Sequence, residues 1–127
     1  MSQQREPFTL KKRLLSFRHA FAGIRDLLLY EHNFRIHLVA AILAVALGFV
    51  LNISLWKWAV LCLVIFLVWI AEAFNSALEK LCDVASPDYN EKIKKAKDYG
   101  AAAVLLASLL AIIAGLILFL PEIFDLL

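Results

Sequence analysis

Residues that build tight turns, crosslinks and metal sites are scarce in this chain of 127 residues, which has four glycines, three prolines and two cysteines. The glycines stand singly, so there is no GxxxxGK motif and no other glycine-rich loop to cradle a phosphate. Cys62 and Cys82 fall on one predicted helix about 30 Å apart, which excludes a disulfide between them within the chain. We interpret both as reduced core thiols. The three histidines lack the spacing of a zinc site.

Charged residues are also few, and apolar residues are unusually abundant. Hydrophobic residues make up 63% of the chain, against about 45–50% in a typical soluble domain. This composition predicts an integral membrane protein. The first long segment is basic and amphipathic and has no short apolar core before a cleavage site, so we expect the N-terminus to be retained.

The first predicted element is an amphipathic helix over residues 9–29, after a disordered N-terminus at residues 1–8. Its apolar positions recur in steps of three and four, and basic residues occupy the other face. The apolar positions are Leu10, Leu14, Phe17, Phe21, Ile24 and Leu28, and the basic ones are Lys11, Lys12, Arg18 and Arg25. Such a helix lies on an anionic leaflet, so we expect no nucleic-acid partner. Whether some of these cations also reach an anionic substrate stays open. A polar collar, Tyr30 to His37, follows this helix, and we assign residues 9–35 to the helix and collar together.

Three membrane spans are predicted within residues 36–120. They cover residues 36–53, residues 55–85 with a cytoplasmic extension, and residues 88–120 with another. Ser86-Pro87-Asp88 has the pattern of a helix start. Small residues recur every four positions in the first and third spans, which favours close helix packing in lipid. These ladders are Ala40, Ala44 and Gly48, then Ala103, Ala107, Ala111 and Gly115. Residues 121–127 form a C-terminal tail.

The basic residues predict the orientation of the chain. Seven Lys or Arg lie between Arg5 and Arg35, five lie between Lys80 and Lys97, and only Lys57 lies between the first two spans. The excess of positive charge on cytoplasmic loops therefore places the N-terminus and the second loop in the cytoplasm.

An acidic stripe follows the second span. Glu72, Asn75, Glu79 and Asp83 are spaced by three or four residues, so they share one helical face at the cytoplasmic membrane boundary. Carboxylates at such a depth are functional candidates by default. Carboxylates beside lysines suit Mg²⁺ held against substrate phosphates. A proton-coupled transporter and a non-catalytic scaffold remain alternatives, although neither explains the whole cluster.

The motifs EAFNSALEKLCD and KAKDYGAAAVL, with Glu31 before the first of three spans, resemble the prokaryotic diacylglycerol kinase family, which includes undecaprenol kinases. The resemblance extends from about Lys11 to Leu120. It implies an all-α homotrimer in the bacterial inner membrane, with sites shared between subunits. It also implies phosphoryl transfer from Mg·ATP to a lipid alcohol at the cytoplasmic face.

The resemblance also implies a role for each motif residue. Glu72 is the catalytic base, and with Asn75 it binds the acceptor lipid. Glu31 and Glu79 are the ligands of Mg²⁺. The nucleotide is bound by Lys12 or Arg13, Glu31, Asn75, Glu79, Lys97 and Asp98, with Asp83 one turn beyond Glu79. At position 37 this chain has a histidine where some members of the family carry an acid. This difference affects only an accessory role of that position and none of the roles given above.

The acceptor is less well determined than the reaction. The SPDYN link and the aromatic Phe74 resemble the undecaprenol kinase branch more than the branch dedicated to diacylglycerol. An allylic alcohol requires one hydroxyl contact and an apolar groove, so we expect undecaprenol to be phosphorylated at least as well as diacylglycerol.

Overall fold

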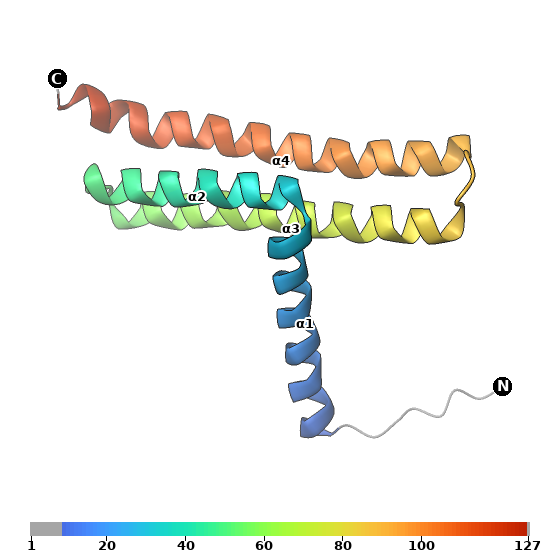
Figure 1. The fold of residues 1–127 in the computed structure, drawn as a ribbon. Coiled ribbons are helices and arrows are strands. Elements are labelled where there is room, and N and C mark those ends of the chain that lie inside the picture. The colour runs from blue at the N-terminus through green and yellow to red at the C-terminus, as the bar shows by residue number, and fades with distance from the viewer. Residues whose placement is uncertain (1–8, 127) are drawn as a thin grey trace.

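The computed structural model describes residues 9–126 and consists of four helices, with no strand in that range. They are α1 (Leu10–Tyr30), α2 (His32–Val50), α3 (Leu55–Ala85) and α4 (Glu91–Phe124). Figure 1 shows α2, α3 and α4 side by side, while α1 projects across the long axis of this bundle. Three of the helices, α2 to α4, are long and apolar enough to cross a membrane. The predicted class of one amphipathic helix and three spans is confirmed; the segment predicted to be disordered, 1–8, lies outside the described residues.

A single residue separates α1 from α2. Glu31 has extended backbone angles, φ −98° and ψ 110°, although its N–H still donates to the carbonyl of Leu27. The first span therefore begins at His32 and ends at Val50, rather than running from 36 to 53. Most of the predicted polar collar is the first turn of α2, because it holds no proline or glycine that would delay the helix.

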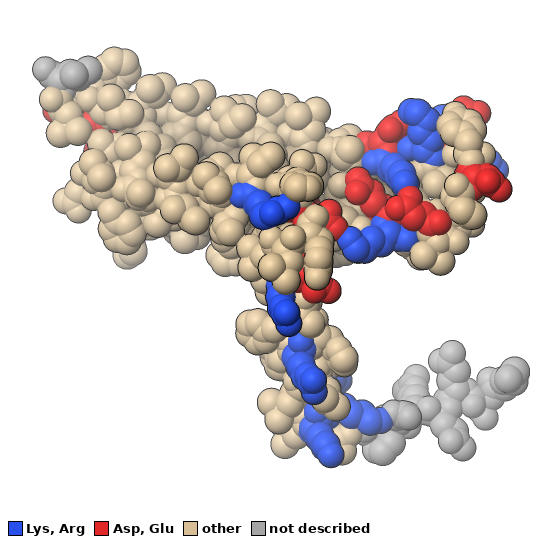
Figure 2. Space-filling model, viewed as in Figure 1, with Lys and Arg blue, Asp and Glu red and all other residues tan. Residues whose placement is uncertain are grey.

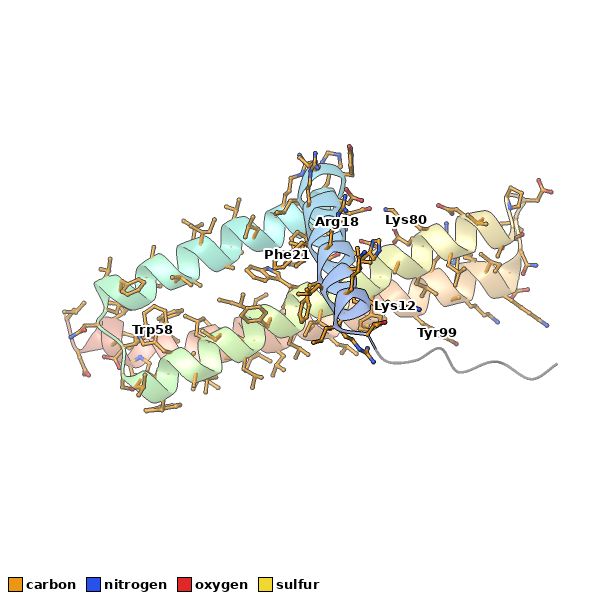
Figure 3. The ribbon with its side chains drawn as sticks, turned by 90° about the horizontal axis from the view of Figure 1, so that it is seen from below. Lys12, Arg18, Phe21, Trp58, Lys80 and Tyr99 are labelled. Atoms are coloured by element: carbon orange, nitrogen blue, oxygen red, sulfur yellow. The ribbon has the colours of Figure 1, made fainter. Side chains whose placement is uncertain are left out.

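The apolar face of α1 is uncovered. Leu10, Leu14, Phe17 and Phe21 are all exposed. In Figure 3, Phe21 points toward the side of the bundle that carries Trp58, whereas Lys12 points toward the side that carries Lys80. A helix that lies across the bundle axis, with its apolar face on the side of the spans, has the geometry of an interfacial helix.

The turn between α2 and α3 closes the end of the bundle farthest from α1. Asn52 takes a left-handed conformation, with φ 52°, which asparagine tolerates better than most residues. Gly48 lets the Trp58 ring approach, since a Cβ at this position would lie 2.9 Å from that ring. A buried apolar cluster completes this end: Ile53, Leu61, Leu118 and Phe119.

The link between α3 and α4 differs from its prediction. The helix start expected at Ser86-Pro87-Asp88 is wrong, because α4 begins at Glu91 with Asn90 as its cap. The Asn90 side chain accepts hydrogen bonds from the backbone N–H groups of Lys92 and Ile93. Ser86 instead ends α3 and donates its hydroxyl to the carbonyl of Asp88, which makes a turn.

The C-terminal tail predicted from residue 121 is also corrected, because α4 continues through Pro121 to Phe124. Proline removes one N–H from the helix, but a cross-helix contact holds the turn around it. Lys57 of α3 lies 2.5 Å from a carboxylate oxygen of Glu122 and donates to the carbonyl of Leu118 at 3.3 Å.

Two smaller expectations have mixed outcomes. Both cysteines are free thiols, as predicted, but only Cys82 is buried, while Cys62 is exposed on the outside of α3. The small-residue ladders are only partly used within one chain. Gly48 and Ala107 are buried, whereas Ala40 and Ala103 are exposed. A ladder follows one helical face for several turns, and a single neighbouring helix covers only part of it.

Charge is segregated along the bundle. Figure 2 shows Lys, Arg, Asp and Glu gathered on α1 and on the end of the bundle that holds the α3–α4 link, while the surface of the spans is almost entirely other residues. The boundary between these surfaces lies at the depth where α1 joins the bundle. The motif residues of α3 begin at the same depth, since Ala73, Ala77 and α1 line one groove.

Candidate active site

One face of α3 changes from apolar to polar without leaving the protein interior. Leu61, Val64 and Val68 are buried, and the same three- and four-residue steps lead to Glu72 and Asn75, which are also buried. Burial of a carboxylate and an amide is costly, and at membrane depth such groups mark functional sites. The first two residues of the predicted stripe therefore face the interior, whereas Glu79 is half-buried and Asp83 is exposed.

Glu72 has the most enclosed polar side chain of this face. It is 2% exposed, and Nε2 of His37 on α2 lies 3.0 Å from its Oε1. Oε1 has no hydrogen bond of good geometry to any of residues 9–126. Glu31 and Glu79 add further negative charge around the carboxylate. A buried carboxylate with unused acceptor capacity suits a group that receives a proton from a bound hydroxyl.

Asn75 connects α3 to α4 and to the next acid of the stripe. Its Nδ2 donates to Oε1 of Glu79 at 3.0 Å. Its Oδ1 is buried without a partner among the described residues and faces Gly100, where an added Cβ would lie only 2.4 Å away. Glycine at position 100 therefore lets α4 approach Asn75 closely. The amide holds Glu79 and retains one free acceptor.

Glu31 reaches the site from the junction between α1 and α2. Its carboxylate forms an ion pair with the ammonium of Lys80 on α3. Both residues line a groove of about 480 Å³ between the C-terminal half of α1 and the polar face of α3. Asp26, Tyr30 and Ser76 are the other polar residues that line this groove. The groove opens beside α1, at the level where the charged and apolar surfaces of the bundle meet.

The two residues predicted from the KD pair are both engaged in ion pairs. Lys97 lies 2.5 Å from a carboxylate oxygen of Asp83 and so joins α4 to α3. Asp98 pairs with Lys94 on the same helix at 2.7 Å, with both side chains exposed. Exposed pairs of this kind are worth about 0–1 kcal/mol, so either can rearrange when a phosphate arrives.

Lys12 and Arg13 are not brought to the other site residues of the same chain. They lie in the first turn of α1, whereas Glu31 follows its last turn. Eighteen residues of helix separate Arg13 from Glu31, about 27 Å at 1.5 Å per residue. Within one chain, the predicted N-terminal cation is therefore remote from the acids on α3.

The acids can be tested for their fit to Mg²⁺. Among residues 9–126, no group of three or more His, Cys, Asp or Glu side chains gathers closely enough to hold a metal by itself. Mg²⁺ is commonly bound by only one or two carboxylates, with substrate phosphates and water completing its shell. The field of Glu31 and Glu79 already attracts one cation, the Lys80 ammonium. The two carboxylates therefore fit a metal that arrives with its nucleotide.

Three residues of the site were missed or undervalued in the sequence. His37 was given only an accessory role, and neither Lys80 nor Gly100 was singled out. Each is defined by a contact between different helices, such as the ion pair of Lys80 with Glu31, 49 positions away. Helical periodicity relates residues three or four positions apart and carries no signal for such contacts. Only the presence of a glycine within a predicted helix, at position 100, hinted at a close approach.

Comparison with known proteins identifies relatives of this chain among lipid kinases. The family model for prokaryotic diacylglycerol kinase matches residues 18–119. A diacylglycerol kinase of Synechocystis is 40% identical over 89% of this chain, which spans 65% of that relative's length. An undecaprenol kinase of Bacillus subtilis is 34% identical over 84% of this chain and 87% of its own length. A diacylglycerol kinase of Escherichia coli K12 is 36% identical over 79% of this chain and 82% of its own length.

The matched region begins on α1, includes every motif residue of α3 and α4, and ends one residue before the end of the predicted third span. It therefore contains Glu31, Glu72, Asn75, Glu79 and Lys97 in one continuous alignment, which favours a kinase over a transporter or a scaffold. The chain belongs to the prokaryotic diacylglycerol kinase family, a family of membrane lipid kinases.

Proposed function

We propose that this chain transfers the γ-phosphoryl group of ATP to the hydroxyl of a membrane lipid at the cytoplasmic surface of a bacterial inner membrane. The observation that carries the proposal is the Glu72 carboxylate, buried beside His37 at the depth where α1 meets the bundle. A lipid alcohol can present its hydroxyl at this depth while its hydrocarbon stays among the spans. A soluble alcohol would require no such placement.

In the proposed reaction, the acceptor hydroxyl gives its proton to Glu72 as its oxygen attacks the γ-phosphorus. The new phosphorus–oxygen bond forms as the bond to the β–γ bridging oxygen breaks, and ADP leaves. Asn75 fixes Glu79 through its amide and offers its free Oδ1 to a donor on the substrate. As in phosphoryl transfer generally, positioning and electrostatic stabilisation supply most of the rate enhancement.

Glu31 and Glu79 would hold Mg²⁺, which neutralises phosphate charge when bound with the nucleotide. Lys80 would then leave Glu31, because a divalent cation competes for the same carboxylate. Lys97 would turn from Asp83 to the phosphates and offset their developing charge, and Asp98 would lie beside the nucleotide. Both lysine movements break ion pairs that involve exposed groups and therefore cost little.

A homotrimer with its N-terminus in the cytoplasm completes the proposal. The exposed apolar face of α1 and the uncovered ladder positions Ala40 and Ala103 leave surface for neighbouring copies. The separation of Lys12 and Arg13 from Glu31 also supports shared sites, in which these cations serve the nucleotide bound by an adjacent copy. The asymmetric distribution of Lys and Arg supports the orientation.

The acceptor is tested with purified protein in mixed micelles that contain Mg·ATP and either undecaprenol or diacylglycerol. We expect undecaprenol to be phosphorylated at least as fast as diacylglycerol, because the surface that lines the α1–α3 groove is mainly apolar. Phe74, however, is exposed and is not among the residues that line this groove. A strong preference for diacylglycerol would overturn the choice of acceptor alone. Phosphorylation of neither lipid would overturn the proposed activity.

The metal is tested with E79Q, assayed over a range of Mg²⁺ concentration. An amide is a poorer ligand for a hard cation than a carboxylate, so we expect half-maximal activity to require about tenfold more Mg²⁺. D88N, in the exposed α3–α4 link, is the matched control and should follow the unaltered protein. An unchanged Mg²⁺ dependence in E79Q would remove Glu79 from the metal site.

A further inference from the structure

His37 is a titratable side chain whose function the acidic motifs leave unexplained. It lies on α2, 35 positions before Glu72 in the sequence, yet its Nε2 is 3.0 Å from the Glu72 carboxylate. The side chain of His37 is 25% exposed and that of Glu72 only 2%. Glu72 is thus enclosed on one side by its own helix and on another by the His37 ring.

The position of His37 is fixed by its neighbours on α2. Phe34 and Ala41 precede and follow it at helical spacing, and both are buried. The Phe34 ring packs against Trp69 of α3, with 6.0 Å between the ring centroids. These contacts hold α2 against α3 on the same face that presents the imidazole. The approach of His37 to Glu72 is therefore built into the helix packing.

We infer that His37 is a positioning residue for Glu72 in the lipid kinase reaction proposed above. Its Nε2 lies 3.0 Å from Oε1, and this contact restrains the rotation of the carboxylate that is to receive the proton of the acceptor hydroxyl. A carboxylate with one oxygen held loses a rotational freedom that would otherwise misalign it, and small misplacements of a base cost large factors in rate. The inference rests on the proposed function, since it concerns the orientation of that reaction's base.

A cavity beside His37 makes a chemical test possible. It has a volume of about 270 Å³ and lies between α2, α3 and α4. His37 lines it together with small residues, among them Ala40, Ala41 and Gly115. If the ring is removed in H37A, the space it leaves adjoins this cavity, so free imidazole can enter and take its place. In H37L the new side chain fills that space.

We expect H37A and H37L to lower kcat about a hundredfold, the lower range for groups that act in proton transfer, with KM for ATP changed less than about twofold. Millimolar imidazole should restore turnover severalfold in H37A and not in H37L. H37Q, which keeps a polar N–H donor, should retain more activity than either. H19A, an exposed histidine on α1, should behave as the unaltered protein with and without imidazole.

Wild-type kcat in H37A, or an equal loss in H37Q and H37A that imidazole does not relieve, would overturn the inference. Helix content and oligomer size in detergent identify any variant that fails to fold, and H37Q then serves in place of H37A. If the unaltered protein phosphorylates neither lipid, the proposed function fails and the inference fails with it. If the unaltered protein phosphorylates a lipid and the His37 variants have the same kcat, the inference fails and the proposed function stands.

Discussion

The two ends of the bundle use polar side chains in different ways. At the end away from α1, Lys57 meets both the Glu122 carboxylate and the Leu118 carbonyl beside a closed apolar cluster. In the half of the bundle that runs from the level of α1 to the α3–α4 link, here called the near end, Glu72 and Asn75 are more deeply buried than either charged partner of that pair. Each keeps a side-chain oxygen without a hydrogen bond among residues 9–126. The first arrangement satisfies its polar groups and stabilises the fold. The second leaves acceptors available for substrate.

Glycine follows the same division. Gly48 makes room for the apolar ring of Trp58 at the far end, whereas Gly100 makes room for the polar Asn75 at the near end. In both places the backbone of one helix approaches a side chain of α3 more closely than a residue with a Cβ would allow. Close approach stabilises packing at one end and sets the position of the Asn75 amide at the other.

The largest expected effect is a loss of turnover when the Glu72 carboxylate, at the near end, is replaced. E72Q should lower kcat about a thousandfold, because an amide cannot accept the hydroxyl proton, while ATP binding persists. Turnover and nucleotide affinity, measured separately, provide the check. E122Q, the matched change at the far end, should leave kcat unaltered. Loss of ATP binding in E72Q with intact helix content would instead move Glu72 into the metal site.

A second prediction compares two glycines of α4. G100A should lower kcat about tenfold, since its Cβ must displace Asn75, and misplaced groups in an active site cost large factors in rate. G115A has no atom within 4 Å of the added methyl and should change kcat by less than twofold. Steady-state kinetics of the two variants suffices. Equal effects would show that the contact with Asn75 has no catalytic role.

A smaller effect is expected when the cation at Glu31 is removed. K80M should lower the Mg²⁺ concentration needed for half-maximal activity by about threefold. In this variant Mg²⁺ no longer has to displace the Lys80 ammonium from the Glu31 carboxylate. K95M removes a lysine that pairs with Glu91 within α4 and serves as the control. Weaker use of Mg²⁺ in K80M would mean that Lys80 helps to bind the nucleotide instead.

The smallest expected effect is confined to the far end. K57M should reduce the free energy of unfolding by about 1 kcal/mol, because Lys57 is largely buried and its ion pair with Glu122 is partly exposed. The kcat of the folded protein should be unchanged. Thermal unfolding in detergent measures the first quantity and the lipid kinase assay the second. A loss of kcat would show that the two ends are coupled.

The sequence by itself determined the class, the number of helices and the acidic face of α3. Long apolar runs and three- and four-residue periodicity are local properties, and they persist whatever the helices later contact. The motif around Glu72 and Asn75 is likewise confined to one helix, so its face was predictable. The ends of the helices were less predictable from the sequence. Asn90 rather than Ser86 caps α4, and Pro121 lies within this helix. Neighbouring side chains decide which of several start and stop signals is used.

Only the tertiary structure decided which groups face that stripe. His37 beside Glu72, Lys80 on Glu31 and Gly100 against Asn75 are contacts between helices, separated by 25 to 49 positions in the sequence. Such pairs depend on how far each helix is rotated and shifted against the next, which the packing of all side chains determines together. A periodic pattern within one helix carries no information about that rotation.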